Sequence, residues 1–169
     1  MNENLINKAL LFAAKHFAKS CHNKNKPVYF HSIKVAMLLF EHGYNETIVV
    51  GAILHDLLED TDATKADINL EFGEEIAKLV DALSFNAKIE DRFLQSKMMI
   101  DKTNEYGKEA LLIKCADLYE NGKYFYLVTD QKTKEYLIKK WNYFIEISEL
   151  TLKKEKIFGL LIEQVAKMK

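Results

Sequence analysis

The chain has 169 residues, of which 49% are hydrophobic and 29% charged, and its formal net charge is −1. This composition is typical of a folded globular protein with its own core, and it excludes a disordered chain. The near-neutral charge excludes a global attraction to nucleic acid or to an anionic membrane. The longest apolar run, Ile48 to Leu54, is too short to span a bilayer, and the start of the chain lacks the basic residues of a signal peptide. We therefore expect one domain over residues 1–169, located in the cytoplasm, without nucleic-acid or membrane partners.

The spacing of apolar residues predicts helices throughout and no strands. Apolar residues recur every three to four positions from Leu5 to Phe17, which predicts a first helix that runs to about Ser20. Asn45 is a suitable N-cap for the third helix. The sequence thus predicts an all-α fold of about eight helices besides a short one at residues 64–72. The other expected helical segments after the first are residues 29–41, 46–59, 74–83, 88–104, 109–120, 133–148 and 152–167.

A polar cluster stands at the end of the third expected helix. His55 and Asp56 follow an apolar run directly and lie about 100° apart on a helix, so both could reach one ion. Glu59 follows one turn after them, and Asp60 one turn after Asp56. Such groups are costly beside a core unless something pairs with them. A metal ion and a polar substrate would do so, whereas the simpler alternative is a helix end with solvated acids.

Two further groups stand where their helices are otherwise apolar. His31 precedes a run of core-like residues in the segment 29–41, and Asp117 follows such a run in the segment 109–120. Two imidazoles and two carboxylates can surround one divalent ion, and this mixture suits Mn²⁺, Fe²⁺ or Zn²⁺ better than Ca²⁺ or Mg²⁺. A metal-bound water would become a nucleophile near neutral pH. We therefore expect the helices to surround a metal-binding cleft.

Four segments, in order, resemble motifs of one family. They are Pro27-Val28-Tyr29-Phe30-His31, the block from Ala52 to Thr61 that contains HD-x-x-ED-T, the segment from Phe72 to Leu83, and Lys114 to Asn121 with the pattern K-x-A-D-x-x-x-N. This order is similar to that of the HD superfamily of metal-dependent phosphohydrolases. The HD-x-x-ED block resembles in particular the hydrolase domain of RelA/SpoT-type alarmone enzymes and the stand-alone small alarmone hydrolases.

The resemblance implies a Mn²⁺-dependent hydrolase that removes the 3′-pyrophosphate from (p)ppGpp. It implies that Glu59 and Asp60 handle the hydrolytic water and the proton, and the sequence leaves open which of them is the base. The four metal ligands that it implies are His31, His55, Asp56 and Asp117.

Some of the expected substrate contacts come from the resemblance, and others from the charge pattern of a polar helix. Lys24 and Lys26 stand in the loop where the family commonly carries an arginine. Lys88 and Arg92 could form a phosphate-facing stripe on a polar helix, with a solvated helix face as the alternative. The full set of expected substrate-binding residues is Lys24, Lys26, Tyr29, Lys88, Arg92 and Asn121.

Two other functions stay open from the sequence. Leu118 and Lys123 replace basic residues of the family's motif, so the substrate could be another nucleotide or a phosphate ester. A non-catalytic helical module that binds nucleotide and keeps the metal as structure is the third hypothesis, although the six acid and ligand positions are all present. The oligomeric state, including a homo-oligomer, is left open, and we expect His16 and His42 to be surface or helix-end residues.

Overall fold

The computed structural model describes residues 3–20, 28–85 and 89–168. These residues form helices α1 to α10 and the short 3-10 helix η1, and they contain no strand. The prediction of an all-α fold is therefore confirmed. The chain divides into two compact units, Met1–Ser84 and Phe85–Lys169.

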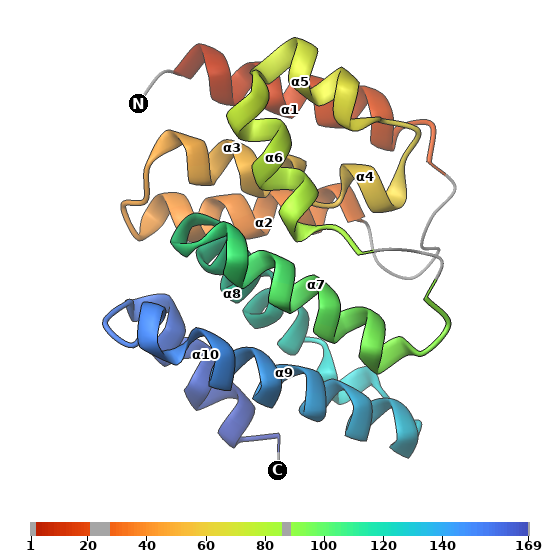
Figure 1. Ribbon diagram of the computed structural model, residues 1–169, viewed down its shortest axis with the longest axis vertical. Helices are drawn as coiled ribbons and strands as arrows, with labels where there is room; N and C mark the ends of the chain where they lie inside the picture. The colour runs from red at the N-terminus through yellow and green to blue at the C-terminus, as the bar shows by residue number, and fades with distance from the viewer. Residues whose placement is uncertain (1–2, 21–27, 86–88, 169) are drawn as a thin grey trace. The chain divides into compact units, whose positions relative to one another are not determined.

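The first unit is built around α3. This helix packs against α1, α2 and α6 (Figure 1), and residues 48–54 within it are all buried. A helix that is apolar on every face needs cover on every side, which explains its central position. The helices of this unit are α1 (Glu3–Phe17), α2 (Val28–Glu41), α3 (Glu46–Leu54), α4 (Leu57–Asp60), α5 (Lys65–Phe72) and α6 (Glu74–Leu83).

The third expected helix is interrupted in the structure. It begins as predicted, with the Asn45 side chain accepting a hydrogen bond from the Ile48 N–H at 3.0 Å. It ends at Leu54, and α4 starts only at Leu57, so the prediction of one helix through Glu59 is wrong. Asp56 has φ −91° and ψ −3°, a sparsely populated region in which active-site residues are often found. His55 and Asp56 therefore stand at a corner between two helices.

Helices α5 and α6 follow the corner as a pair that pack against each other. A capping box begins α5, because Thr64 Oγ1 accepts from the Asp67 N–H at 3.2 Å and Asp67 Oδ2 accepts from the Thr64 N–H at 2.8 Å. Gly73 joins the two helices with φ +86°. Glycine adopts this backbone conformation without the steric cost that a side chain would add.

The second unit is built around α8 in the same way. Helix α8 packs against α7, α9 and α10 (Figure 1), and residues 110–118 within it are all buried. Trp141 and Phe144 of α9 are also buried, as a core role requires. The elements of this unit are α7 (Arg92–Tyr106), α8 (Lys108–Gly122), η1 (Phe125–Leu127), α9 (Gln131–Leu152) and α10 (Lys156–Ala166). Among the helices of the described residues, none combines the length and apolarity that a membrane span requires.

Candidate metal centre and active site

The first unit brings two buried histidines together. His31 on α2 is 4% exposed, and His55 at the end of α3 is 2% exposed. Their ring centroids are 5.6 Å apart and the rings meet edge to face. Ligand nitrogens of the two imidazoles lie within 4.8 Å of each other, so a single ion could bind both.

Asp56 adds a carboxylate to this pair. The Nδ1–H of His55 donates to the carbonyl oxygen of Ala52 at 2.8 Å. In a neutral imidazole this leaves Nε2 as the acceptor nitrogen, and Nε2 lies 3.0 Å from Asp56 Oδ1. A ring nitrogen and a carboxylate oxygen at that distance could both bind one cation, and a main-chain carbonyl on the far nitrogen is how metal-binding histidines are commonly oriented. The corner between α3 and α4 thus fits a divalent ion that accepts mixed nitrogen and oxygen ligands.

Asp117 lies in the second unit, on the central helix α8. It is 5% exposed, and one charged and one polar neighbour on the same helix hold its two oxygens. The Lys114 ammonium lies 2.9 Å from Oδ2, and the Asn121 amide donates to Oδ1. Each carboxylate oxygen has more than one lone pair, so these contacts leave capacity for a metal. Helix α8 therefore carries an oriented, buried carboxylate.

The two expected catalytic carboxylates belong to the single turn of α4. The Asp60 N–H donates to the Asp56 carbonyl oxygen at 2.9 Å, so Asp60 is held one turn from Asp56. Glu59 and Asp60 line a cavity of about 220 Å³. The other residues that line it are His16, Lys19, Ser20, Thr61 and Asp62.

The expected substrate-binding residues are partly engaged within the fold. The Tyr29 hydroxyl donates to the Leu10 carbonyl oxygen at 2.9 Å, and burial raises the pKa of Tyr29. The Arg92 guanidinium lies 4.2 Å from the centroid of the Tyr136 ring, and Asn121 holds Asp117. The expected contacts Lys24, Lys26 and Lys88 lie outside the described residues.

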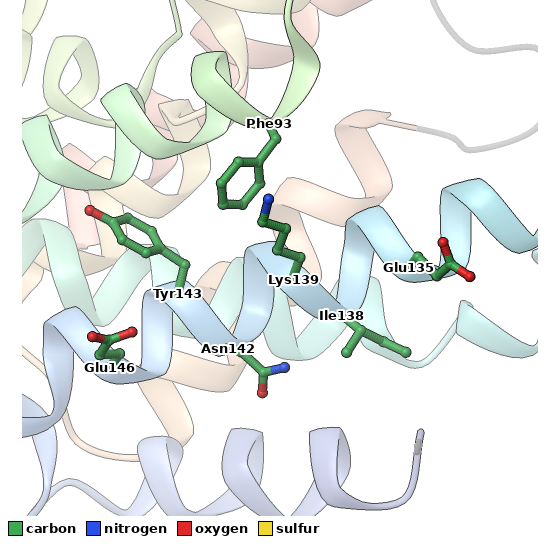
Figure 2. Close-up of a pocket in the computed structure, with 7 residues that line it drawn as sticks. All are labelled: Phe93, Glu135, Ile138, Lys139, Asn142, Tyr143 and Glu146. Atoms are coloured by element: carbon green, nitrogen blue, oxygen red, sulfur yellow. The ribbon is translucent and has the colours of Figure 1, made fainter.

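A larger cavity, of about 470 Å³, lies along α9 in the second unit. Figure 2 shows its lining, with the Lys139 side chain pointing toward the Phe93 ring; the ammonium is 3.9 Å from the centroid of that ring. Its lining contains none of the expected metal or catalytic residues, and its carboxylates come from Glu135 and Glu146 without a histidine. Size alone therefore does not make it the better candidate for the reaction.

Sequence reasoning missed two supporting interactions. Lys114 precedes Asp117 by three residues, a helical spacing that could have revealed the ion pair. His16 donates through its Nδ1–H to Asp62 Oδ1 at 2.7 Å. These two residues are 46 positions apart, so no local pattern connects them.

Comparison with known proteins places this architecture in a family. A family model described as an HD domain matches residues 9–106, which is more than half of the chain. The chain belongs to the HD domain family. The matched part of the HD domain includes His31, the corner at His55 and Asp56, and the α4 carboxylates, and it ends before Asp117.

Relatives of this HD domain are named as pyrophosphohydrolases or pyrophosphokinases. It is 34% identical over 130 residues to the guanosine-3′,5′-bis(diphosphate) 3′-pyrophosphohydrolase of Aquifex aeolicus, covering 72% of this chain and 18% of that protein. It is 31% identical over 140 residues to the GTP pyrophosphokinase rsh of Brucella ovis, covering 78% of this chain and 18% of that protein. A probable 3′-pyrophosphohydrolase of Mycoplasma pneumoniae is 31% identical over 128 residues, or 69% of this chain and 18% of that protein. The chain thus spans less than a fifth of the length of these relatives.

Solved structures share the fold. A metazoan ortholog of SpoT, described as hydrolysing ppGpp and playing a role in starvation responses, superimposes with a TM-score of 0.80 at 22% identity, covering 99% of this chain and 97% of that one. The protein lmo0812 of Listeria monocytogenes gives a TM-score of 0.70 at 24% identity, covering 82% of this chain and 97% of that one. At these identities the similarity establishes the fold of the HD domain.

Proposed function

We propose that this HD domain is a metal-dependent phosphohydrolase that removes the 3′-pyrophosphate from (p)ppGpp, giving GDP or GTP and pyrophosphate. The observation that carries the proposal is the corner at His55 and Asp56, where an acceptor nitrogen and a carboxylate oxygen lie 3.0 Å apart beside the buried ring of His31. The substrate is chosen because relatives from Aquifex aeolicus and Mycoplasma pneumoniae are named for this reaction.

In this proposal His31, His55, Asp56 and Asp117 would hold the metal. Mn²⁺ is the expected ion, and Fe²⁺ and Zn²⁺ suit the same donors. Such an ion would supply a bound water with a pKa lowered toward neutrality.

The carboxylates of α4 manage the proton in this proposal. One of Glu59 and Asp60 orients the attacking water and takes its proton, while the 3′ oxygen of the ribose receives a proton as the bond to phosphorus breaks. The hydrogen bond from the Asp60 N–H to the Asp56 carbonyl oxygen ties this pair to the metal ligand. Substrate binding is assigned to Lys24, Lys26, Tyr29, Lys88, Arg92 and Asn121 as part of the proposal.

Product analysis with ppGpp and Mn²⁺ tests the function. The purified chain should release pyrophosphate, and a variant that combines His55→Ala with Asp56→Ala should not. Turnover of ppGpp no higher than that of the double variant would contradict the proposal.

A second candidate is hydrolysis of another nucleotide or a phosphate ester. Leu118 and Lys123 favour it, because the family's motif has a basic residue at the position of Leu118 and an arginine at that of Lys123. A panel of phosphorylated metabolites separates the candidates, since a phosphatase releases orthophosphate whereas the proposed reaction releases pyrophosphate. Mn²⁺ binding without hydrolysis of any panel member, together with tight nucleotide binding, would instead favour a non-catalytic module.

A further inference from the structure

The proposed catalytic carboxylates, Glu59 and Asp60, lie on a helix that is too short to be stable by itself. Helix α4 has four residues, Leu57–Asp60, and no side chain caps its first turn. A single helical turn is unstable in isolation because nucleation is costly. Leu57 is fully buried and anchors one side of the turn. The position of Glu59 and Asp60 must therefore depend on what holds the residues that follow.

The end of α1 and the turn that follows it hold those residues at two points. The Ser20 hydroxyl donates to the Asp60 carbonyl oxygen at 2.6 Å, and the Nδ1–H of His16 donates to Asp62 Oδ1 at 2.7 Å. The hydrogen bond from His16 lowers the pKa of Asp62, which keeps that carboxylate ionised as the acceptor. The two bonds fix the main chain on either side of Thr61.

The His16 ring is itself fixed by aromatic neighbours. Its side chain is 12% exposed, and its ring centroid lies 4.6 Å from that of Phe12. Phe12 in turn meets Phe72 of α5 edge to face at 5.3 Å. The imidazole is thus aimed at Asp62 by packing within the first unit, which gives the hydrogen bond a defined direction.

Thr61, between the two points, is also restrained. Its Oγ1 donates to the Leu57 carbonyl oxygen at 2.7 Å and accepts from the Ala63 N–H at 3.0 Å. Every residue from Asp60 to Asp62 therefore has a named contact that limits its movement. His16 and Ser20 line the same cavity of about 220 Å³ as Glu59 and Asp60, so the restraint acts where substrate and water would meet the carboxylates.

We propose that His16 and Ser20 are positioning residues that hold α4 in the orientation in which Glu59 and Asp60 can act on the hydrolytic water. In this proposal they act through the main chain of Asp60 and the side chain of Asp62 and take no part in the reaction itself. The inference rests on the proposed function of the chain. A displacement of about 1 Å in such a site can cost about a hundredfold in rate, so the loss of either restraint should be visible in turnover.

Paired variants separate positioning from general stability. His16→Phe keeps an aromatic ring against Phe12 but removes the donor, whereas His16→Asn places an amide N–H near the position of Nδ1. Ser20→Ala removes the hydroxyl and Ser20→Thr keeps it. Lys8→Met is the control, because Lys8 joins α1 to α5 through Glu71 at 3.0 Å and does not line the cavity.

Steady-state kinetics with ppGpp and Mn²⁺ gives the readout, together with Mn²⁺ affinity and thermal midpoints. We expect His16→Phe and Ser20→Ala to lower kcat by about tenfold or more, with KM and Mn²⁺ affinity within twofold of wild type. His16→Asn and Ser20→Thr should recover most of the rate, and Lys8→Met should keep it.

The outcomes distinguish this inference from the proposed function. Wild-type kcat in both His16→Phe and Ser20→Ala would overturn the inference and leave the function standing. Equal losses in the conservative and disruptive variants, or losses explained by weaker Mn²⁺ binding, would also overturn it. Absence of pyrophosphate release by the wild-type chain would instead contradict the function, and that result is obtained before any variant is compared.

Discussion

Lys114 and Asp117 are charged residues that lie among apolar residues of helix α8. Both side chains are 7% exposed, and they lie 2.9 Å apart as an ion pair. Removing one partner of a buried pair leaves the other charge without compensation. The ammonium of Lys114 therefore stabilises the carboxylate that we propose as a metal ligand, and it does so in the absence of metal.

The Lys114→Met variant tests this role. It keeps the length of the side chain but removes its charge, so we expect the metal-free protein to lose about 3–5 kcal/mol of unfolding free energy. Mn²⁺ would then supply the missing positive charge, and its addition should raise the thermal midpoint by more in the variant than in wild type. Melting curves with Mn²⁺ or with a chelator give both quantities.

Lys78→Met is the matched control for this comparison. Lys78 forms an exposed ion pair with Glu74 at 2.7 Å on α6, and exposed pairs contribute little to stability. Its melting curves should match those of wild type. An equal shift by Mn²⁺ in wild type and Lys114→Met would show that Asp117 does not bind the metal.

At the scale of helices, the sequence correctly predicted the two buried central helices. It did not predict the break between α3 and α4. The fully apolar runs at residues 48–54 and 110–118 became the buried helices α3 and α8. The break at His55 and Asp56 was missed because the apolar spacing continues into Leu57 and neither glycine nor proline marks it. The corner is set by tertiary packing, which a local pattern does not contain.

Gly73 tests how strictly the junction between α5 and α6 is specified. A Cβ at this position would meet nothing within 4 Å, but the backbone has φ +86°. Strain alone should therefore make Gly73→Ala less stable than wild type by about 1–2 kcal/mol. Chemical denaturation with a helix signal measures the change.

Gly159→Ala, which is also a glycine-to-alanine substitution, should have the opposite effect on stability. Gly159 lies within α10 with ordinary helical geometry, and a Cβ there also meets nothing within 4 Å. Alanine should stabilise the helix by about 0.5–1 kcal/mol. Unchanged stability of Gly73→Ala would contradict the role of the backbone angle at Gly73, and destabilisation by Gly159→Ala would contradict the open space at Gly159.

At the scale of the whole chain, we propose one HD hydrolase domain over residues 1–169 with one metal centre. The ligands that we assign to it come from α2, from the corner after α3, and from α8. The sequence predicted these residues from their types and order. It could not predict the contact of His16 with Asp62, because that contact depends on how α1 packs in the folded unit.

Hydrogen exchange tests whether Mn²⁺ binding stabilises the residues of each unit. Saturating Mn²⁺ should slow amide exchange in both units, because a ligand that binds only the folded state stabilises it; the gain is about 2.7 kcal/mol at a hundredfold excess over Kd. In the Asp117→Asn variant, protection by Mn²⁺ should be confined to the first unit. Protection of the second unit in that variant would contradict the shared site.

The most direct test of the account is a crystal structure of the chain with Mn²⁺, located by its anomalous scattering. We predict one ion bound by nitrogens of His31 and His55 and by oxygens of Asp56 and Asp117, at about 2.0–2.3 Å for such ligands. An ion bound elsewhere, or these four residues without an ion at saturating Mn²⁺, would contradict the proposed metal centre and the hydrolysis that depends on it.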